Sequence, residues 1–174
     1  MSSGGSLYFI AHVDVGGSEL WRADLATGSV NRLEINPGSS VSNIDELLDV
    51  NGTLYFSAYH PSTGYELYRI SSSSATPELI ELRSGGSSSS PDRLTNVNGT
   101  LYFVAYSDTA GYELWRLPAG GQPSVIDVVS GGSSSSPENL LNANGVLYFT
   151  ASNSANGREL WKLDGSTGSP VLRH

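Results

Sequence analysis

The chain has 174 residues, no cysteine, and 9 Lys plus Arg against 17 Asp plus Glu, for a formal charge of −8. An acidic surface repels nucleic-acid backbones and anionic lipid, so we predict neither as a partner. The lack of cysteine excludes disulfides and thiolate metal sites, and no apolar run is long enough for membrane insertion. Residues 1–6 contain no apolar stretch typical of a signal peptide. The protein is therefore either cytosolic as expressed or numbered from after a removed segment.

Two short motifs recur four times at a nearly constant spacing. Leu-Tyr-Phe begins at Leu7, Leu54, Leu101 and Leu147, and Glu-Leu-Trp or Glu-Leu-Tyr begins at Glu19, Glu66, Glu113 and Glu159. The steps are 47, 47 and 46 residues for both motifs. Such a period predicts one supersecondary unit that is built four times. We predict a single repeat domain over residues 1–174, with units at 1–43, 44–90, 91–136 and 137–174.

In chain order, the first unit begins at its second strand, from Leu7 onward. The second unit adds a first strand near 44–50, where Asp45–Val50 is the one segment of ambiguous type, and a hairpin turn at Asn51-Gly52. The third unit contains a complete meander, with strands at Leu94–Val97, Thr100–Tyr106, Tyr112–Leu117 and Ser124–Val129. The fourth unit turns at Asn144-Gly145 and ends inside its fourth strand, at 170–174. Asn-Gly between alternating runs predicts a tight hairpin, because type I′ turns need positive φ at both central residues.

Both faces of the predicted strands carry large apolar side chains. In Leu101–Ala105, Leu, Phe and Ala lie on one face, and Tyr and Val lie on the other. A sheet that is apolar on both faces must lie between neighbours, and four-stranded repeats of this length are typical of propeller blades. We predict an all-β, β-propeller-type repeat domain of four-stranded antiparallel blades, with a linear β-stack or solenoid as the alternative.

The first strand of the unit is predicted only three times, so one inner strand is missing. Three outcomes follow: four blades with a defective last sheet, two chains in one eight-bladed ring, or an exposed edge that accepts a strand from another molecule. We favour association, and predict a homo-oligomer, either a dimer or a filament.

Several stretches resemble the ELWxxDGT repeat, an element of large bacterial secreted or surface proteins. They are Ile35-Asn36-Pro37-Gly38-Ser39, Val97-Asn98-Gly99-Thr100-Leu101-Tyr102-Phe103, and Gly157-Arg158-Glu159-Leu160-Trp161-Lys162-Leu163-Asp164-Gly165. The resemblance covers nearly the whole chain, although only the fourth copy keeps Asp-Gly after the Trp motif. It implies an extracellular or cell-surface, non-catalytic repeat protein, and it brings no ligand.

Each repeated glutamate has a cation three positions later. The acids are Glu19, Glu66, Glu113 and Glu159, and the cations are Arg22, Arg69, Arg116 and Lys162. Residues three apart on a strand point to opposite faces, so the acid of one blade could meet the cation of the next. We predict a ring of inter-blade ion pairs, because converging acids without partners would cost several kcal/mol each, roughly, in desolvation. The alternative is a metal or proton site made of the acids. The Trp and Tyr of the same motifs are predicted to be core residues.

The loops between the second and third strands hold aromatic and polar residues on a rigid scaffold, where recognition is common. Candidate ligand-binding residues are Tyr59, Tyr65, Tyr106, Tyr112, Asp108 and Asn153. Tyr rings beside Asp and Asn suit a glycan, whereas ordinary solvated turns are the plainer interpretation. We predict no cofactor and no metal; Asp14 and Asp108 offer oxygen ligands to Ca²⁺ without the dense acidic spacing of a dedicated site.

Catalysis finds no support in the sequence. The three histidines, His12, His60 and His174, occupy unrelated positions, and no nucleophile elbow or P-loop is present. The serine runs, two of which follow Gly-Gly and precede Pro, are predicted to be extended connections between blades. The leading hypothesis is a structural or interaction module that self-associates by ring completion or strand exchange. The alternative is a carbohydrate-binding lectin that uses the tyrosine-bearing loops.

Overall fold

The computed structural model describes residues 1–13, 17–36, 41–74, 76–129, 131, 133–163 and 168–173, without the side chains of residues 13 and 17. These residues form β-strands, turns and connections, and no helix occurs among them. Within the same ranges, nothing meets the length and hydropathy of a membrane-crossing helix.

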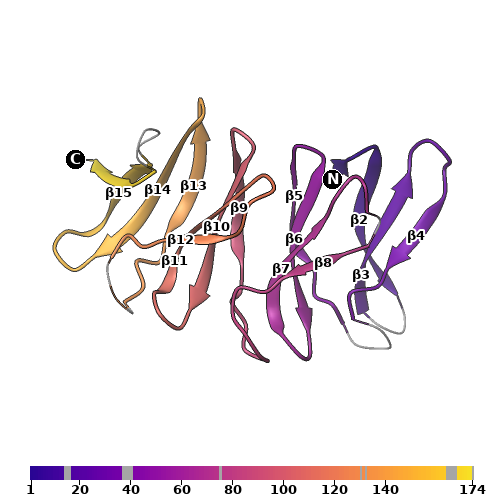
Figure 1. Cartoon of the computed structure of the whole chain (residues 1–174), viewed down its shortest axis with the longest axis horizontal. Helices are drawn as coiled ribbons and strands as arrows, with labels where there is room; N and C mark the ends of the chain where they lie inside the picture. The colour runs from indigo at the N-terminus through magenta and orange to yellow at the C-terminus, as the bar shows by residue number, and fades with distance from the viewer. Residues whose placement is uncertain are drawn as a thin grey trace. The chain divides into compact units, whose positions relative to one another are not determined.

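The strands form four antiparallel sheets of four strands each (Figure 1). The first sheet comprises β1 (Ser2–Ser3), β2 (Ser6–Val13), β3 (Gly17–Asp24) and β4 (Val30–Leu33), and the second comprises β5 (Asp45–Val50), β6 (Thr53–His60), β7 (Gly64–Ile70) and β8 (Glu78–Ile80). The third comprises β9 (Asp92–Val97), β10 (Thr100–Ser107), β11 (Gly111–Pro118) and β12 (Ser124–Ile126), and the fourth comprises β13 (Glu138–Ala143), β14 (Val146–Asn153), β15 (Gly157–Leu163) and β16 (Pro170–Arg173). Each sheet is a meander in sequence order, as the repeats predicted.

Tight turns with positive φ join the first two strands of each sheet. Asn98 and Gly99 have φ values of 51° and 79°, and the other Asn-Gly pairs match them. In the first sheet, Gly4 and Gly5 take this place, with φ values of 52° and 80°. Strand β1 therefore occupies the position where the sequence predicted a missing inner strand, although it has only two residues. The ambiguous segment Asp45–Val50 is strand β5.

A register irregularity interrupts the first strand of the second, third and fourth sheets. In the third sheet, Thr95 pairs with Tyr102 and Asp92 pairs with Val104, so β9 contains an extra residue relative to β10. Arg93, inside this bulge, has a φ of 58°. A bulge interrupts the regular alternation of side chains between the two faces of a sheet. The side chains at the start of β5, β9 and β13 therefore point in directions that differ from a regular strand.

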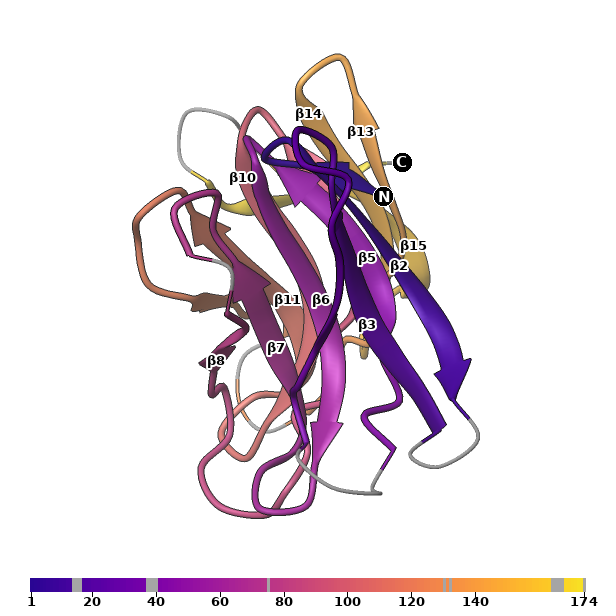
Figure 2. The ribbon, with the colours of Figure 1, turned by 90° about the vertical axis from the view of Figure 1, so that its right-hand side faces the viewer.

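The chain divides into two compact units, Met1–Ser90 and Pro91–His174. In each unit, one sheet packs on the other through unlike faces. We call the face with the Leu and Phe of Leu-Tyr-Phe the Phe face, and the face with its Tyr the Tyr face. The Tyr face of the first sheet, with Tyr8 and Leu20, packs on the Phe face of the second, with Leu54 and Phe56. Figure 2 shows the strands of the first sheet, β2 and β3, beside those of the second, β6 and β7.

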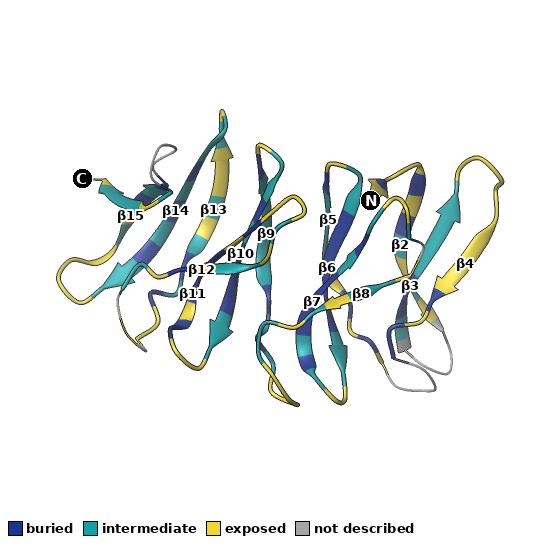
Figure 3. Cartoon of the chain, in the orientation of Figure 1, coloured by how far each residue is buried: buried dark blue, intermediate teal, exposed yellow. Residues whose placement is uncertain are grey.

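The second unit repeats this arrangement. Leu114, on the Tyr face of the third sheet, shares a core with Leu147, Phe149 and Trp161 on the Phe face of the fourth. Aromatic pairs reinforce the hairpins, as in Phe103–Trp115, whose ring centroids lie 6.2 Å apart. Trp115 and Trp161 are buried core residues, as predicted. Burial is concentrated in the second and third strands, whereas β4 is mostly exposed (Figure 3).

Candidate functional site

The buried carboxylate of Glu66 is held by serine and backbone donors. The Ser89 backbone N–H donates to Oε1 at 3.1 Å, and the Ser89 hydroxyl donates to Oε2 at 2.7 Å. The Leu82 backbone N–H donates to Oε2 at 2.9 Å. Both carboxylate oxygens are thus bonded although the side chain is fully buried, as a buried acid requires.

Glu113 repeats this arrangement in the second unit. The Ser135 N–H donates to Oε1 at 2.6 Å, its hydroxyl donates to Oε2 at 2.5 Å, and the Val128 N–H donates to Oε2 at 3.1 Å. The flanking serines bind the backbone of the adjacent strand: the Tyr112 N–H donates to Ser134 Oγ at 2.8 Å, and the Ser136 N–H donates to the Tyr112 carbonyl at 3.1 Å. We call this set of contacts, between a glutamate and the serine that follows it by 22 or 23 residues, the serine clasp.

The serine clasp also links one sheet to the next. In the second unit, Ser135 binds Glu113 of the third sheet, and its carbonyl accepts the Ser152 N–H of the fourth sheet at 2.8 Å. In the first unit, the Ser42 hydroxyl donates to buried Glu19 at 2.9 Å, and its carbonyl accepts the Tyr59 N–H at 2.7 Å. One serine therefore connects adjacent sheets through both its side chain and its backbone.

The predicted inter-blade ion pairs are wrong for Glu19, Glu66 and Glu113, because serines and amides occupy the carboxylates. The cations have other partners: Arg22 donates to Ser6 Oγ, Arg69 pairs with Glu78 at 2.8 Å, and Arg116 donates to Ser124 Oγ. For Lys162, no ion pair forms with any residue in the described ranges. The physical reason is geometric. The cations project from the Tyr face, away from the carboxylates. The short serine segment lies against the strand edge beside the acid. Its N–H and O–H donors cost less free energy to bury than a cation.

Burial raises the pKa of the Glu19, Glu66 and Glu113 carboxyls above the ordinary value of 4.5. Desolvation is the main cause in each case, because it penalises the charged form. The hydrogen bonds from Ser42, Ser89 and Ser135 act in the opposite direction. The clasp thus offsets part of the cost of keeping an ionised acid in the interior.

Two glycines make room for the serine clasp. Gly64, with a φ of 73°, is placed so that an added Cβ would meet Ser88 Oγ at 2.5 Å and its backbone N at 2.7 Å. At Gly111, with a φ of 71°, an added Cβ would meet Ser134 Oγ at 2.5 Å. Both the backbone conformation and the close approach require glycine here.

The fourth glutamate, Glu159, differs from the other three. It is only half-buried, and none of the residues that the structure describes donates a hydrogen bond to its carboxylate. Gly157 has the same backbone conformation as its counterparts, with a φ of 74°, yet beyond its chain neighbours no atom of the described residues lies within 4 Å of where its Cβ would be. The fourth sheet therefore carries the glutamate and the glycine of a serine clasp, and no serine among the described residues completes it.

The tyrosines predicted to bind a ligand form two separate pairs. Tyr59 and Tyr65 have ring centroids 5.2 Å apart, and so do Tyr106 and Tyr112. The Tyr65 hydroxyl accepts a hydrogen bond from Asn43 at 2.9 Å. The predicted site residue Asp108 lies in the turn after β10. Asn153 stabilises its own turn, because its Oδ1 accepts the N–H groups of Ala155 and Asn156, and Asp14 is outside the described residues.

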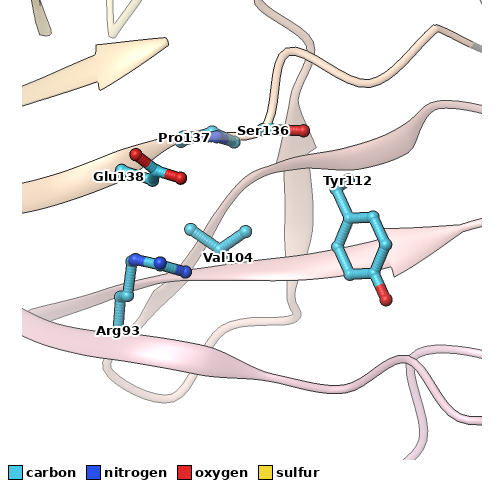
Figure 4. A pocket seen from close by; sticks show the side chains of 6 residues that line it. All are labelled: Arg93, Val104, Tyr112, Ser136, Pro137 and Glu138. Atoms are coloured by element: carbon cyan, nitrogen blue, oxygen red, sulfur yellow. The ribbon is translucent and has the colours of Figure 1, made fainter.

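One of these tyrosines lines a cavity of about 220 Å³ in the second unit. Its walls are Arg93, Val104, Tyr112, Ser136, Pro137 and Glu138. Figure 4 shows Val104 between Tyr112 on one side and the charged ends of Arg93 and Glu138 on the other. Arg93 pairs with Asp92, and Glu138 pairs with Arg158 at 3.2 Å. The cavity combines an aromatic wall with polar groups, whereas no cluster of three or more potential metal ligands occurs among the described residues.

Comparison with known proteins places the fold. No protein-family model matches the chain, and no curated protein sequence matches it. Similar solved structures include a prolyl endopeptidase (TM-score 0.60, 14% identity, 98% of this chain and 26% of that chain) and TolB from Acinetobacter baumannii (0.57, 15%, 97% and 41%). An acylaminoacyl peptidase from Pyrococcus horikoshii is also similar (0.60, 12%, 100% and 26%). The chain spans well under half of each of these proteins. The similar structures are propeller-type domains, and they show that this chain has a β-propeller-type repeat fold, as the sequence predicted.

Sequence reasoning missed the serine clasp, although a signal was present. The serines follow their glutamates by 23 residues in the first two copies and 22 in the third, as in Glu66–Ser89 and Glu113–Ser135. Ser89 and Ser135 lie inside serine runs, whose low complexity predicts only extended connections, so the nearly constant offset from the glutamates is the signal that identifies them.

Proposed function

We propose that this chain is a non-catalytic structural and interaction module whose repeats associate with those of further copies. The observation that carries the proposal is the exposure of two unlike apolar faces. Leu7, on the Phe face of the first sheet, is 42% exposed, whereas its counterpart Leu54 is fully buried. Leu160, on the Tyr face of the fourth sheet, is 44% exposed, whereas its counterpart Leu114 is fully buried.

These faces are of the two kinds that already pack on each other inside each unit. The Phe face of one sheet covers the Tyr face of the preceding sheet, and this contact buries Leu20 in the first unit and Leu114 in the second. A copy that brings its first sheet onto the fourth sheet of another copy would reproduce that contact. Such a head-to-tail interface generates closed rings or open filaments, and burial of apolar area supplies the driving force.

Light scattering coupled to size-exclusion chromatography tests the proposal. The wild-type mass should rise with concentration over the micromolar range, and Leu7→Asp or Leu160→Asp should each abolish the rise. Leu25→Asp is the matched control, because Leu25 is exposed in a turn outside both faces. A mixture of L7D and L160D should form dimers and nothing larger, because each variant keeps one intact face. A wild-type protein that stays monomeric throughout would contradict the proposal.

A cell-surface or extracellular location belongs to the same proposal. It rests on the resemblance to the ELWxxDGT repeat of bacterial secreted and surface proteins. The non-catalytic role is supported by the use of the buried acids: Glu66 and Glu113 are occupied by serine and backbone donors rather than directed into a cleft. A fractionation experiment that recovered the protein only from the cytosol of its native host would contradict the location.

Carbohydrate binding is the second candidate function, and the cavity beside Tyr112 favours it. An aromatic ring that is partly exposed beside Arg and Glu side chains suits a sugar ring and its hydroxyls. A glycan array should then show binding that Tyr112→Ala removes. Tyr59→Ala is the control, because Tyr59 lies in the first unit, outside this cavity. Absence of binding across the array would leave the structural module as the sole candidate.

A further inference from the structure

We propose that the edge of β15 at Gly157–Glu159 is a binding site for an extended, serine-rich segment of a further repeat of the same kind. This inference rests on the proposed association of repeats, and it names the contact that such a partner would make. The occupant would complete a fourth serine clasp on Glu159. It would be a Gly-Ser-Ser-Ser-Ser-Pro segment of the kind that this chain carries between its second, third and fourth sheets.

Among the described residues, no strand pairs with this edge. Strand β16, as far as it is described, pairs with β15 from Leu160 to Leu163. In the third sheet, β12 likewise pairs with β11 from Leu114 onward. The preceding residues, Gly111–Glu113, are hydrogen-bonded by the serine run instead. The start of β15 has the same position in its sheet and no serine run among the described residues. An unpaired strand edge is a ready template for an added strand.

The backbone groups that would receive the segment are in place. Tyr112 pairs with Tyr106, and its N–H and carbonyl bind the serine run on the outer edge of β11. Arg158 pairs with Ser152 in the same register. The Arg158 N–H and carbonyl therefore lie on the same outer edge of the sheet. The N–H can donate to the hydroxyl of one serine, and the carbonyl can accept the N–H of the serine two positions later.

The open space at Gly157 fits the same occupant. At Gly64 and Gly111 an added Cβ would collide with a serine hydroxyl at 2.5 Å. At Gly157 the backbone has the same positive φ, and beyond its chain neighbours no atom of the described part of the chain lies within 4 Å of the added Cβ. A glycine with a φ of 74° is needed for a hairpin end of this shape, and here it also leaves the volume that a serine backbone occupies in the other two sheets.

Glu159 supplies the recognition chemistry. In the complete clasps, the glutamate accepts a backbone N–H and a hydroxyl from one serine, at 3.1 and 2.7 Å in the second sheet. Glu159 is placed to accept the same two bonds. Charge-assisted hydrogen bonds of this kind are stronger than neutral ones, and the pair of bonds distinguishes serine from alanine at that position.

Fluorescence anisotropy with a labelled peptide of residues 131–141 tests the inference on the full chain. The peptide contains the serine run of the third clasp and its following strand. We expect saturable binding to the wild-type chain. A matched peptide with Ser135 replaced by alanine should bind at least about tenfold more weakly, because it lacks the hydroxyl that bonds the carboxylate.

Variants of the chain locate the site. Glu159→Gln should weaken peptide binding about tenfold or more, because a Gln side chain offers one acceptor oxygen in place of two. Gly157→Ala should abolish it by filling the serine position. Glu34→Gln is the control, since Glu34 lies in the first unit and pairs with Arg32. Circular dichroism confirms that each variant is folded.

The results separate this inference from the proposed function. Absence of peptide binding at millimolar concentration, or equal binding by wild type, E159Q and the alanine peptide, would overturn the inference even if copies associate in light scattering. Selective binding that E159Q removes would support it even if the wild-type chain alone remained monomeric.

Discussion

Ser135 donates two hydrogen bonds to Glu113, one from its backbone N–H at 2.6 Å and one from its hydroxyl at 2.5 Å. The carbonyl of the same serine accepts the Ser152 N–H of the next sheet. A single residue thus satisfies a buried acid and ties two sheets together. Because the acid is fully buried, each of these bonds replaces water that the carboxylate has lost.

Ser135→Ala should therefore destabilise the protein by about 2 kcal/mol, the usual range for a lost hydrogen bond to a charged group. Ser133→Ala is the matched control, because Ser133 belongs to the same run and is exposed. We expect it to change the free energy of unfolding by less than about 0.5 kcal/mol. Urea unfolding of the two variants measures both effects, and equal midpoints would contradict the clasp.

Glu113→Ala should cost more, about 3 kcal/mol, because three donors would lose their acceptor in the interior. A drop in melting temperature is the measurement, and an unchanged melting temperature would refute the structural role of the acid. Glu81→Ala is a suitable control, since Glu81 lies in the connection after β8 and is not part of a clasp.

Glu113→Gln isolates the pH dependence of the clasp. Burial raises the pKa of this carboxyl above 4.5, so between the two values the folded state binds more protons than the unfolded state. Stability then falls as pH rises through this window. The contribution is fully present below pH 4.5 and is lost as pH rises through the raised pKa. Stability measured from pH 4 to 8 should decline less steeply in E113Q than in wild type, and parallel curves would contradict this assignment.

Much of the fold was predictable because it is specified locally. The Asn-Gly turns and the alternation in Leu101–Ala105 place strands without reference to the rest of the chain, and both are as predicted. The serine clasp was not predictable in the same way. Its donors include a backbone N–H, which every residue type except proline has, and Ser135 acts 22 residues after Glu113. Hydrophobic periodicity carries no information about such a contact.

The ion-pair prediction was wrong for a related reason. It followed correctly from the three-residue spacing of Glu113 and Arg116 that they point to opposite faces, but spacing alone does not say which segment lies beside the acid. The turn at Gly4-Gly5 was also missed, because two glycines replace the Asn-Gly signal found in the other repeats.

A pair of glycine variants separates backbone strain from the clasp. Gly111→Ala and Gly157→Ala both place alanine at a φ near 70°, which costs about 1–2 kcal/mol. Only at Gly111 does the new Cβ also meet a serine, at 2.5 Å from Ser134 Oγ. G111A should therefore be the more destabilising by about 2 kcal/mol, in line with other overpacked sites. Chemical unfolding of both variants decides the matter, and equal losses would mean that the serine run moves aside freely.

Trp115 and Trp21 occupy equivalent positions in the third and first sheets, and they should respond differently to substitution by Phe. The Trp115 indole N–H donates to the Ala105 carbonyl at 3.0 Å, and Trp161 does the same to Ala151 at 3.1 Å. The buried N–H of Trp21, in the first sheet, has no hydrogen-bond partner among the described residues.

Trp115→Phe should thus cost about 1 kcal/mol for the lost bond in addition to the smaller ring. Trp21→Phe loses buried ring area, which destabilises the protein, but it also removes a buried N–H that has no acceptor, which stabilises it. We therefore expect a change close to zero or a slight gain in stability. Thermal unfolding of the two variants at matched concentration measures the difference. If W21F were as destabilising as W115F, the Phe face of the first sheet would have to be covered in solution, which mass measurements on the same samples would reveal.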